Sequence, residues 1–456
     1  MNIGLLIVNG YHGAVVGNLV ERRKKPVGKR IDFSGYKAVL SMREAYRFDV
    51  GTAFMRIFQF MVTIGTISML TMAGYSTLAS GTIASVASLS IFLISPRVSK
   101  RIDEKGQSAV LPKAICMTLL GLVVLLVNVA LGGPAWLCYP AAVLIGFLPS
   151  GPSLARTRWT YLLQTGRLGD NPPELKTIYA YEGLIEDIVF MVGPAIAVVL
   201  SSSVVPIAGM VFGGVLLAVG TVLTISSKST EPDAAWRTEM AAATAKRLGQ
   251  DSVPVKRRSM FVESGAVRMI FVSNLLMGAL FGCFDTTTIA FTQELGYPNA
   301  ASAVFMLSAV SSMVVGVMFG MVKFKASRQV QFSTAAILIG ALWAFLTFVD
   351  GIEILLVVVG IASLVYAPFL ISGNALCEQV VPPERLTESL TWLNTGIICG
   401  LAVGPTVAGA IIDAMGATIG YDLAAIMGLA LALFNVATIP LWKRTIARHE
   451  AERAEE

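Results

Sequence analysis

Long apolar stretches separated by shorter polar segments recur along the whole chain. A helix that crosses a bilayer needs about 20 mostly apolar residues, and twelve of the stretches come near that length. They lie at residues 50–72, 78–95, 111–131, 137–157, 178–200, 203–225, 267–292, 301–322, 331–349, 353–376, 389–412 and 421–442. The pattern predicts an all-α membrane protein with twelve transmembrane helices.

Two of these stretches are similar to each other, about 210 residues apart. Each follows a Pro-Pro-Glu segment and contains a Gly-Pro pair, which removes a backbone donor and lets neighbouring helices approach closely. The matching segments are Pro172–Glu174 with Gly193 and Pro194, and Pro382–Glu384 with Gly404 and Pro405. The repeat indicates two pseudo-symmetric bundles of six helices.

The repeat divides the chain into five parts. We expect a cytoplasmic N-terminal tail at 1–48, a first six-helix bundle at 49–226 and a second at 266–442. The polar segment 227–265 contains no predicted crossing and is expected to be a cytoplasmic linker, and 443–456 a cytoplasmic tail.

Composition and charge support a membrane location and give an orientation. Mean hydropathy is +0.71, with 55% hydrophobic and 14% charged residues, which excludes an ordinary soluble domain. All 35 Lys and Arg residues except Arg56 fall in segments on one side of the predicted topology. Because basic residues concentrate on the cytoplasmic side, we expect a multi-pass protein of the cell (inner or plasma) membrane with both termini in the cytoplasm. The net charge of +6 then reflects orientation, and no nucleic-acid binding is expected.

The residues that usually carry enzyme or metal chemistry are scarce inside the predicted crossings. The two histidines, His12 and His449, lie in the tails, and the five cysteines show no paired spacing. We therefore expect no metal site, no bound cofactor and no enzymatic activity. Any proton relay inside the membrane must use carboxylates.

Acidic residues interrupt the stretch 178–200 at Glu182, Glu186 and Asp187. A charge at the centre of a membrane helix costs at least ~2.5–3.5 kcal/mol, so each is a candidate proton-coupling group. Glu182 and Glu186 share one helix face, whereas Asp187 points about 100° away from Glu186. Arg56 lies at a similar depth in 50–72, so it is a candidate partner for either glutamate. The pair can be a static buried salt bridge, or a switch in which one carboxylate takes up a proton and releases the arginine.

Asp285 differs, because no basic residue lies at its depth in any crossing. It stands about 18 residues into 267–292, which at 1.5 Å per residue places it in the outer half of the bilayer. We expect it to be neutral at rest and to couple protons or to recognise a cation. The alternative is a protonated acid bonded to Thr286–Thr288 or to a helix carbonyl. Other polar residues of the crossings can line a substrate pocket or satisfy helix contacts: Gln59, Asn274, Asn374, Trp392 and Asn394.

With six plus six crossings, both ends inside and a long central loop, the chain resembles the major facilitator superfamily from its first crossing to its last. That family carries a G-x-x-x-D-x-x-G-R type motif after its second crossing. Asp103 and Gly106 match it, whereas Ser99 and Gln107 replace the first glycine and the arginine. The resemblance makes Asp103 and Gly106 inner-gate residues, and we assign Arg101 to the same gate. Arg156 and Arg158, at the inner end of the fourth crossing, are candidates for a latch of this gate or for anchors at the cytoplasmic surface. The replacements predict a weaker gate.

Gly193 and Pro194 also resemble part of the glycine-proline motif of that family's exporters, although Val192 and Ala197 replace its usual glycines. The family fold implies that the first and fifth crossings are neighbours, which favours a pair between Arg56 and Glu182 or Glu186. It also implies a binding site near the midplane between two rocking halves, in a protein that acts as a monomer.

Together these features predict a secondary transporter that exports a small organic compound, amphipathic or cationic, with the proton gradient as its energy source. Its partners would be that small molecule, protons and the lipid bilayer. The alternative is uptake or exchange of a polar nutrient such as a sugar. A receptor on the same scaffold would be expected to carry large soluble domains, and none is evident.

Overall fold

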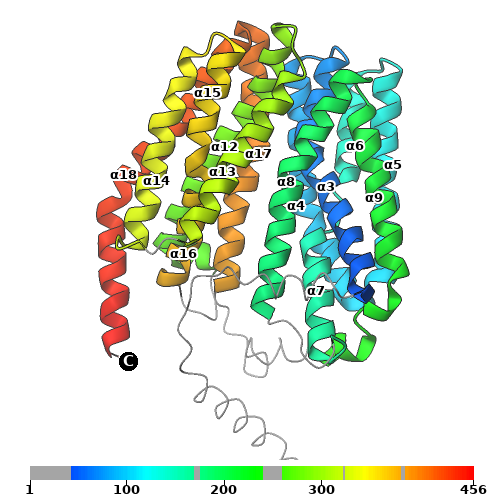
Figure 1. The fold of residues 1–456 in the computed structure, drawn as a ribbon, viewed down its shortest axis with the longest axis vertical. Coiled ribbons are helices and arrows are strands. Elements are labelled where there is room, and N and C mark those ends of the chain that lie inside the picture. The colour runs from blue at the N-terminus through cyan, green and yellow to red at the C-terminus, as the bar shows by residue number, and fades with distance from the viewer. Residues whose placement is uncertain (1–42, 169–174, 240–258, 322–323, 382–385, 456) are drawn as a thin grey trace, which may run out of the picture.

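The computed structural model describes residues 43–168, 175–239, 259–321, 324–381 and 386–455 (Figure 1). Within these ranges all regular secondary structure is helical, which confirms the predicted fold class. Eleven helical stretches there are long and apolar enough to cross a membrane. Two of these stretches, Arg328–Phe348 and Ile352–Val380, are continuous runs of α-helix and 3-10 helix.

The first half of the chain contains α3 (Arg43–Met72), α4 (Thr77–Lys105), α5 (Gln107–Ala130), η1 (Ala135–Leu137), α6 (Cys138–Ile145), α7 (Gly151–Gln164), α8 (Leu175–Ser203), α9 (Ala208–Ser226) and η2 (Lys228–Thr230). The second half contains α11 (Met260–Glu263), α12 (Gly265–Glu294), α13 (Ala300–Met321), α14 (Arg328–Trp343), η3 (Ala344–Phe348), α15 (Ile352–Ala362), η4 (Ser363–Val365), α16 (Tyr366–Val380), α17 (Leu386–Met415) and α18 (Ala417–Glu455).

The fourth predicted crossing, 137–157, is not one helix, so its prediction as an uninterrupted span was wrong. It consists of α6 and α7, separated by a break at residues 146–150. The cause is local: Pro149 and Pro152 provide no backbone N–H, and a residue that precedes proline is driven away from helical geometry. Ser150 is extended, with φ −68° and ψ 106°, and α7 starts after it.

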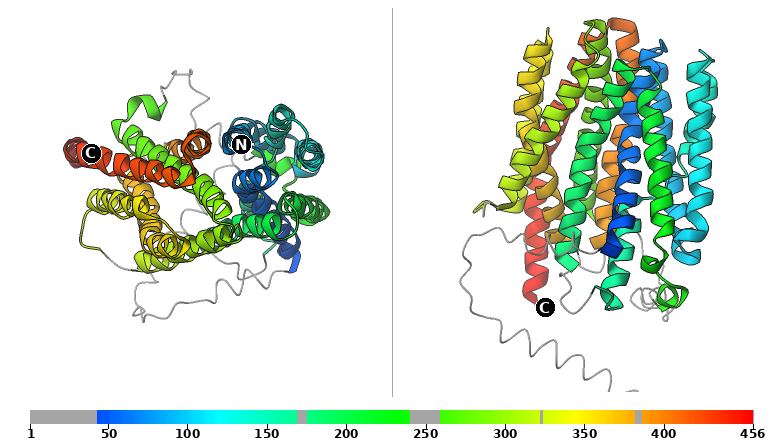
Figure 2. Two further views of the ribbon diagram at one scale, coloured as in Figure 1. Left: turned by 90° about the horizontal axis from the view of Figure 1, so that it is seen from above. Right: turned by 45° about the vertical axis from the view of Figure 1, so that its right-hand side comes forward.

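Helix pairing repeats between the halves. In the first half α3 packs on α8 and α9, and in the second half α12 packs in the same way on α17 and α18. The halves meet along two seams, α4 against α17 and α8 against α13, which are equivalent under the repeat. Figure 2 shows the two groups of helices side by side when seen from above.

The bundle has two distinct ends. Helices α3 and α12 begin, and α9 and α18 end, at the same end of the bundle (Figure 1), which we name the linker end. The opposite end, where α3 ends and α4 begins, is the far end. Large apolar side chains such as Leu120, Val215 and Val357 are exposed on the outer faces of the helices between the ends. Such a surface fits an integral membrane protein whose outer faces contact lipid.

Glycines let the central helices touch. A Cβ on Gly193 would lie 3.1 Å from the Ile57 carbonyl oxygen of α3, and one on Gly404 would lie 2.6 Å from the Ala279 oxygen of α12. The Pro405 carbonyl of α17 is close enough to α4 that a Cβ on Gly81 would overlap it. The Gly-Pro pairs identified in the sequence therefore mark helix contacts in both halves.

Gly400 provides a test of this packing. A Cβ there would lie 2.2 Å from the Leu275 carbonyl oxygen, a distance that only backbone movement can relieve. We expect Gly400→Ala to lower the free energy of unfolding by about 1–3 kcal/mol, the usual cost of overpacking. Gly183→Ala is the matched control, because nothing lies within 4 Å of its Cβ position and it also stands inside a helix. Unfolding in mixed micelles compares the two, and equal stability of both variants would contradict close packing of α12 and α17.

Candidate functional site

A fully buried ion pair joins α3 to α8. The Arg56 guanidinium is paired through Nη2 with Glu182 Oε2, and both side chains are 0% exposed. Trp159 of α7 donates from Nε1 to the other carboxylate oxygen of Glu182, at 2.7 Å. Of the two glutamates that the sequence offered to Arg56, the structure therefore places Glu182 beside it.

Asp49 is a third charged group at this site. It precedes Arg56 by seven residues, so both side chains lie on one face of α3. The side chain is 6% exposed, and the Tyr181 hydroxyl donates to its Oδ2 at 2.6 Å. Its Oδ1 has no hydrogen-bond partner among the described residues. Tyr181, which bonds Asp49, directly precedes Glu182 in α8, so both acids belong to the same contact between α3 and α8.

Sequence reasoning missed Asp49 because the first crossing was predicted to begin at residue 50, whereas α3 begins at Arg43. One signal was available: the seven-residue spacing from Arg56 places the acid on the same helix face as the one basic residue that lies in the interior of a predicted crossing and not at its end.

The break in the fourth crossing shapes this site. Gly151, the first residue of α7, packs against Arg56, and a Cβ there would lie 2.8 Å from Arg56 Cγ. From this start, α7 carries Trp159 to Glu182 and to Phe48, whose ring centroid lies 5.2 Å from that of Trp159. Non-helical backbone at membrane depth occurs where protein surrounds it, as it does here.

Glu186 pairs with a different arginine. Its Oε2 lies 3.4 Å from Arg156 Nη2, and the two side chains are 34% and 46% exposed. This pair is half open to its surroundings, unlike the pair of Arg56 with Glu182. The side chain of Asp187 lies outside the described part of the structure.

Arg158 connects segments within the first half. It is buried, and it donates to Gln107 Oε1 at 2.7 Å and to the Ser227 carbonyl and Thr230 Oγ1, both at 2.8 Å. Gln107, which replaces the arginine of the loop motif, thus receives a bond from an arginine of α7. The hydrogen bonds of Arg158 attach the segment after α9 to the linker end of the first half.

The loop motif itself lies at the linker end of α4. Asp103 and Arg101 are exposed, and Gly106 follows the helix with φ +93°, a conformation that favours glycine. Nearby, Tyr161 donates to Asp233 at 3.1 Å. The pKa of Asp233 is lowered, first by the backbone N–H of Trp236 and then by this hydroxyl.

In the second half, Asp285 of α12 is partly accessible, whereas the adjoining Thr286–Thr288 are buried. No ion pair joins Asp285 to another side chain in the described ranges. The Thr286 and Thr287 hydroxyls donate to the carbonyls of Gly282 and Cys283 in their own helix, at 2.9 and 2.7 Å. Each hydroxyl can still accept a hydrogen bond from a protonated Asp285, so the alternative of an acid bonded to these threonines stays a prediction.

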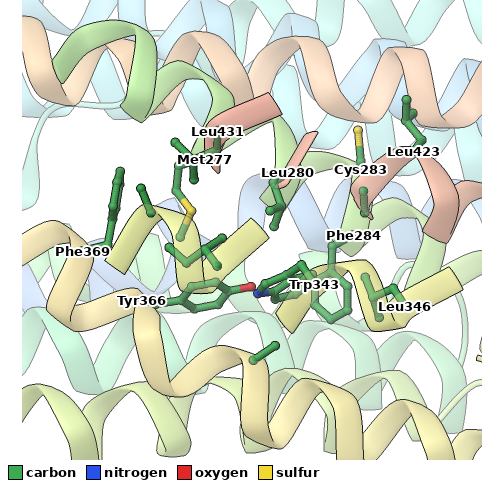
Figure 3. Packing of buried hydrophobic residues seen from close by; sticks show 14 of the residues in the cluster. Met277, Leu280, Cys283, Phe284, Trp343, Leu346, Tyr366, Phe369, Leu423 and Leu431 are labelled. Atoms are coloured by element: carbon green, nitrogen blue, oxygen red, sulfur yellow. The ribbon is translucent and has the colours of Figure 1, made fainter. Parts of the chain in front are cut away.

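An aromatic cluster stands beside Asp285. Phe281, one turn earlier on α12, lies 4.5 Å from the Tyr366 ring, and Tyr366 stacks on Trp343 at 5.4 Å between ring centroids. Phe284 meets the edge of Trp343 at 4.8 Å (Figure 3). Two residues of this cluster, Phe281 and Phe284, are thus close to Asp285 along α12, and the Asp285 side chain itself is partly accessible.

The five pocket candidates separate into two groups. Asn274 Nδ2 donates to the Leu393 carbonyl at 3.0 Å, and Trp392 Nε1 donates to Ser259 Oγ at 3.1 Å. Both bonds connect helices within the second half, which favours the alternative of helix contact for these two. Gln59 is half-buried, and Asn374 and Asn394 are exposed.

Hydrogen bonds join the halves at the far end. The Asp413 carboxylate, near the end of α17, accepts from the backbone N–H groups of Thr77 and Leu78 at 2.7 and 2.8 Å. These are the first residues of α4, where the helix dipole favours a negative charge. Ser203 also donates to Asn299 Oδ1 at 2.9 Å, between α8 and the start of α13. These contacts hold the far end closed.

We expect Asp413→Asn to weaken this closure, because the amide has no charge and only one acceptor for two N–H groups. Spin labels at Leu131 and Phe348, two exposed positions at the ends of far-end helices in opposite halves, report the opening. Pulsed electron paramagnetic resonance should show a longer distance population in the variant. Asp350→Asn, at another exposed far-end acid, is the control, and unchanged distances in Asp413→Asn would contradict the prediction.

No protein-family model matches the sequence. The multi-drug resistance efflux pump PmrA of Streptococcus pneumoniae is 25% identical over 155 residues, which cover 33% of this chain and 39% of the relative's length.

Solved structures match over nearly the whole chain. The nucleoside transporter NupG aligns with a TM-score of 0.63 at 16% identity, over 87% of this chain and 99% of that chain. The POT family transporter PepTSo aligns at 0.62 and 12% identity, over 90% and 98%. The human organic anion transporter MFSD10 aligns at 0.53 and 13% identity, over 86% and 99%. The chain thus has the major facilitator fold that its sequence resembles. All of these proteins are transporters, in agreement with the expectation that the chain is not an enzyme.

Proposed function

We propose that this protein is a secondary transporter that couples the movement of protons to the export of a small organic compound across the cell membrane. The observation that carries the proposal is Asp285: an acid within a membrane-crossing helix, without an ion pair in the described structure, and partly accessible. An intramembrane acid of this kind is favoured as a proton-binding group. The proton gradient would supply the energy, with no bound cofactor.

The fold supports alternating access as the mechanism. In transporters built from repeats, the site lies near the membrane midplane between two halves that move against each other. The bonds of Asp413 and Ser203 close the far end, so the site would face the linker end in this state. The distribution of basic residues predicts that the linker end is cytoplasmic, which makes this the state that loads a compound from inside the cell.

The compound that fits Asp285 best carries a positive charge or an apolar body. A cation can replace the proton on the carboxylate, and the partly accessible ring of Phe281, one turn earlier on α12, favours an apolar or cationic group. Similarity of part of the chain to an efflux pump supports export. The alternative is uptake or exchange of a polar nutrient, and the likeness in fold to a nucleoside transporter and a peptide transporter supports it.

The test uses purified protein in liposomes with an imposed pH gradient and a pH dye inside. A panel of organic cations, neutral amphipathic compounds, nucleosides, peptides and sugars is added to vesicles with and without protein. Compound-dependent proton movement opposite to the compound would establish antiport. A nucleoside, peptide or sugar that equilibrates without moving protons would replace export with the alternative.

A further inference from the structure

The charges buried around Arg56 do not balance. Asp49, Arg56 and Glu182 are all at most 6% exposed, and they comprise two acids and one base. If both acids were ionised, the cluster would carry an uncompensated negative charge inside the protein, which is strongly unfavourable. We propose that Asp49 and Glu182 share one exchangeable proton, which makes Asp49 the proton-carrying group of the first six helices.

The hydrogen bonds assign the proton to Asp49. Glu182 already has a donor on each oxygen, Arg56 Nη2 on Oε2 and Trp159 Nε1 on Oε1. Asp49 has one donor, the Tyr181 hydroxyl on Oδ2, and Oδ1 has none in the described structure. A proton on Oδ1 turns that oxygen into a donor, and the neighbouring Glu182 carboxylate can accept from it.

Among the side chains that the structure describes, the neighbouring helices supply no other charge that acts on Asp49. The groups that act on it are Glu182 and Tyr181 of α8 and Arg56 of α3. Arg158 of α7 is occupied by Gln107, Ser227 and Thr230, and α9 contains no titratable residue. Arg47 of α3, Lys228 of η2 and the charged residues near the end of α4 are exposed, as are Arg268 and Glu294 of α12. A proton is therefore the available compensation for the second acid.

Loss of this proton would change how α3 and α8 hold each other. The ionised Asp49 would compete with Glu182 for Arg56, whose Nε is buried and has no partner among the described residues. A shift of the guanidinium toward Asp49 weakens its pair with Glu182, which is the ion pair between the described side chains of the two helices. Asp49 is six residues from the start of α3, so the proton would pass to water at the linker end.

The inference deepens the proposed function and rests on it for the role of the proton in transport, but the sharing of the proton is measurable by itself. Infrared spectra of the purified protein, recorded as pH is changed, contain the C=O band of each protonated carboxyl group. We expect the wild-type spectrum to contain a titrating band that is absent from Asp49→Asn and present in the control Glu353→Gln, which removes an exposed acid of α15. An Asp49→Asn spectrum with the full wild-type carboxylic-acid signal would overturn the proposal.

Tyr181→Phe is the second variant, in case Asp49→Asn does not fold. It removes the hydroxyl that donates to Asp49 but leaves both acids in place. The band assigned to Asp49 should change frequency, and an unchanged band would overturn the proposal. The liposome assay distinguishes the shared proton from proton-coupled transport. If the infrared band behaves as expected but the protein moves no protons in liposomes, proton-coupled transport is refuted and the shared proton is not.

Discussion

Replacing Glu182 with leucine is expected to cost about 3–5 kcal/mol of unfolding free energy, the usual effect of removing one partner of a buried ion pair. The variant leaves the Arg56 guanidinium fully buried, and the Trp159 indole N–H loses its acceptor. Trp159 Nε1 then has no acceptor in the described ranges, and Arg56 keeps the long bond from Nη1 to the backbone carbonyl of residue 182, at 3.5 Å. Unfolding of the purified protein in mixed micelles, followed by the decrease in helical circular dichroism, measures the loss.

The double variant Arg56→Met with Glu182→Leu distinguishes loss of a pair from loss of packing. Apolar residues of similar volume remove both charges, so we expect most of the stability to return. Glu186→Leu is the matched control one turn along the same helix. Its pair with Arg156 is half exposed, and such pairs contribute about 0–1 kcal/mol. Equal losses in Glu182→Leu and Glu186→Leu would show that burial does not set the strength of these pairs.

Hydropathy predicted the crossings because lipid-facing and core-facing positions are both apolar in this fold. It failed at the fourth crossing because hydropathy measures the polarity of side chains and does not describe the geometry of the backbone. The window average counts Pro149 and Pro152 as mildly polar, whereas their effect is on the backbone, where each removes an N–H donor and disfavours helical geometry in the residue before it. The predicted boundary at residue 50 erred similarly: α3 extends past its apolar stretch to Arg43, and this extension buries Asp49.

The positions of the residues along their predicted helices allow Arg56 to pair with either Glu182 or Glu186. These positions do not identify which glutamate is the partner. The choice depends on the rotation of α8 against α3 and on Trp159, whose helix starts only after the break at 146–150. The pocket residues show the same limit. Asn274 and Asn394 have similar sequence signals, yet the first bonds a carbonyl of α17 and the second is exposed.

The acids of the two halves have different surroundings, which suggests different tasks. Asp285 is partly accessible and has no ion pair in the described chain, as the proposed contact with a compound requires. Asp49 and Glu182 are enclosed by Arg56, Tyr181 and Trp159, so only a proton can exchange there. A transporter with both kinds of acid would bind the compound in its second half and bind or release the proton in its first half.

Replacing Asp285 with asparagine is expected to abolish compound-driven proton movement in liposomes, to the level of protein-free vesicles. The amide keeps the size of the side chain but cannot carry an exchangeable proton, so coupling is lost while the fold remains. Exchange of labelled for unlabelled compound, which needs no net proton movement, should persist for neutral compounds and decrease for cations.

The matched control for Asp285→Asn is Glu378→Gln, which neutralises an exposed acid of α16 and should retain wild-type proton movement. The two halves can then be compared directly, because Asp49→Asn removes the other proposed proton carrier. Proton movement that survives Asp285→Asn but not Asp49→Asn would place coupling on the cluster of Asp49 and Glu182. In that case Asp285 would recognise the compound and take no part in coupling, since the carboxylate that binds the proton need not be the one that the compound touches.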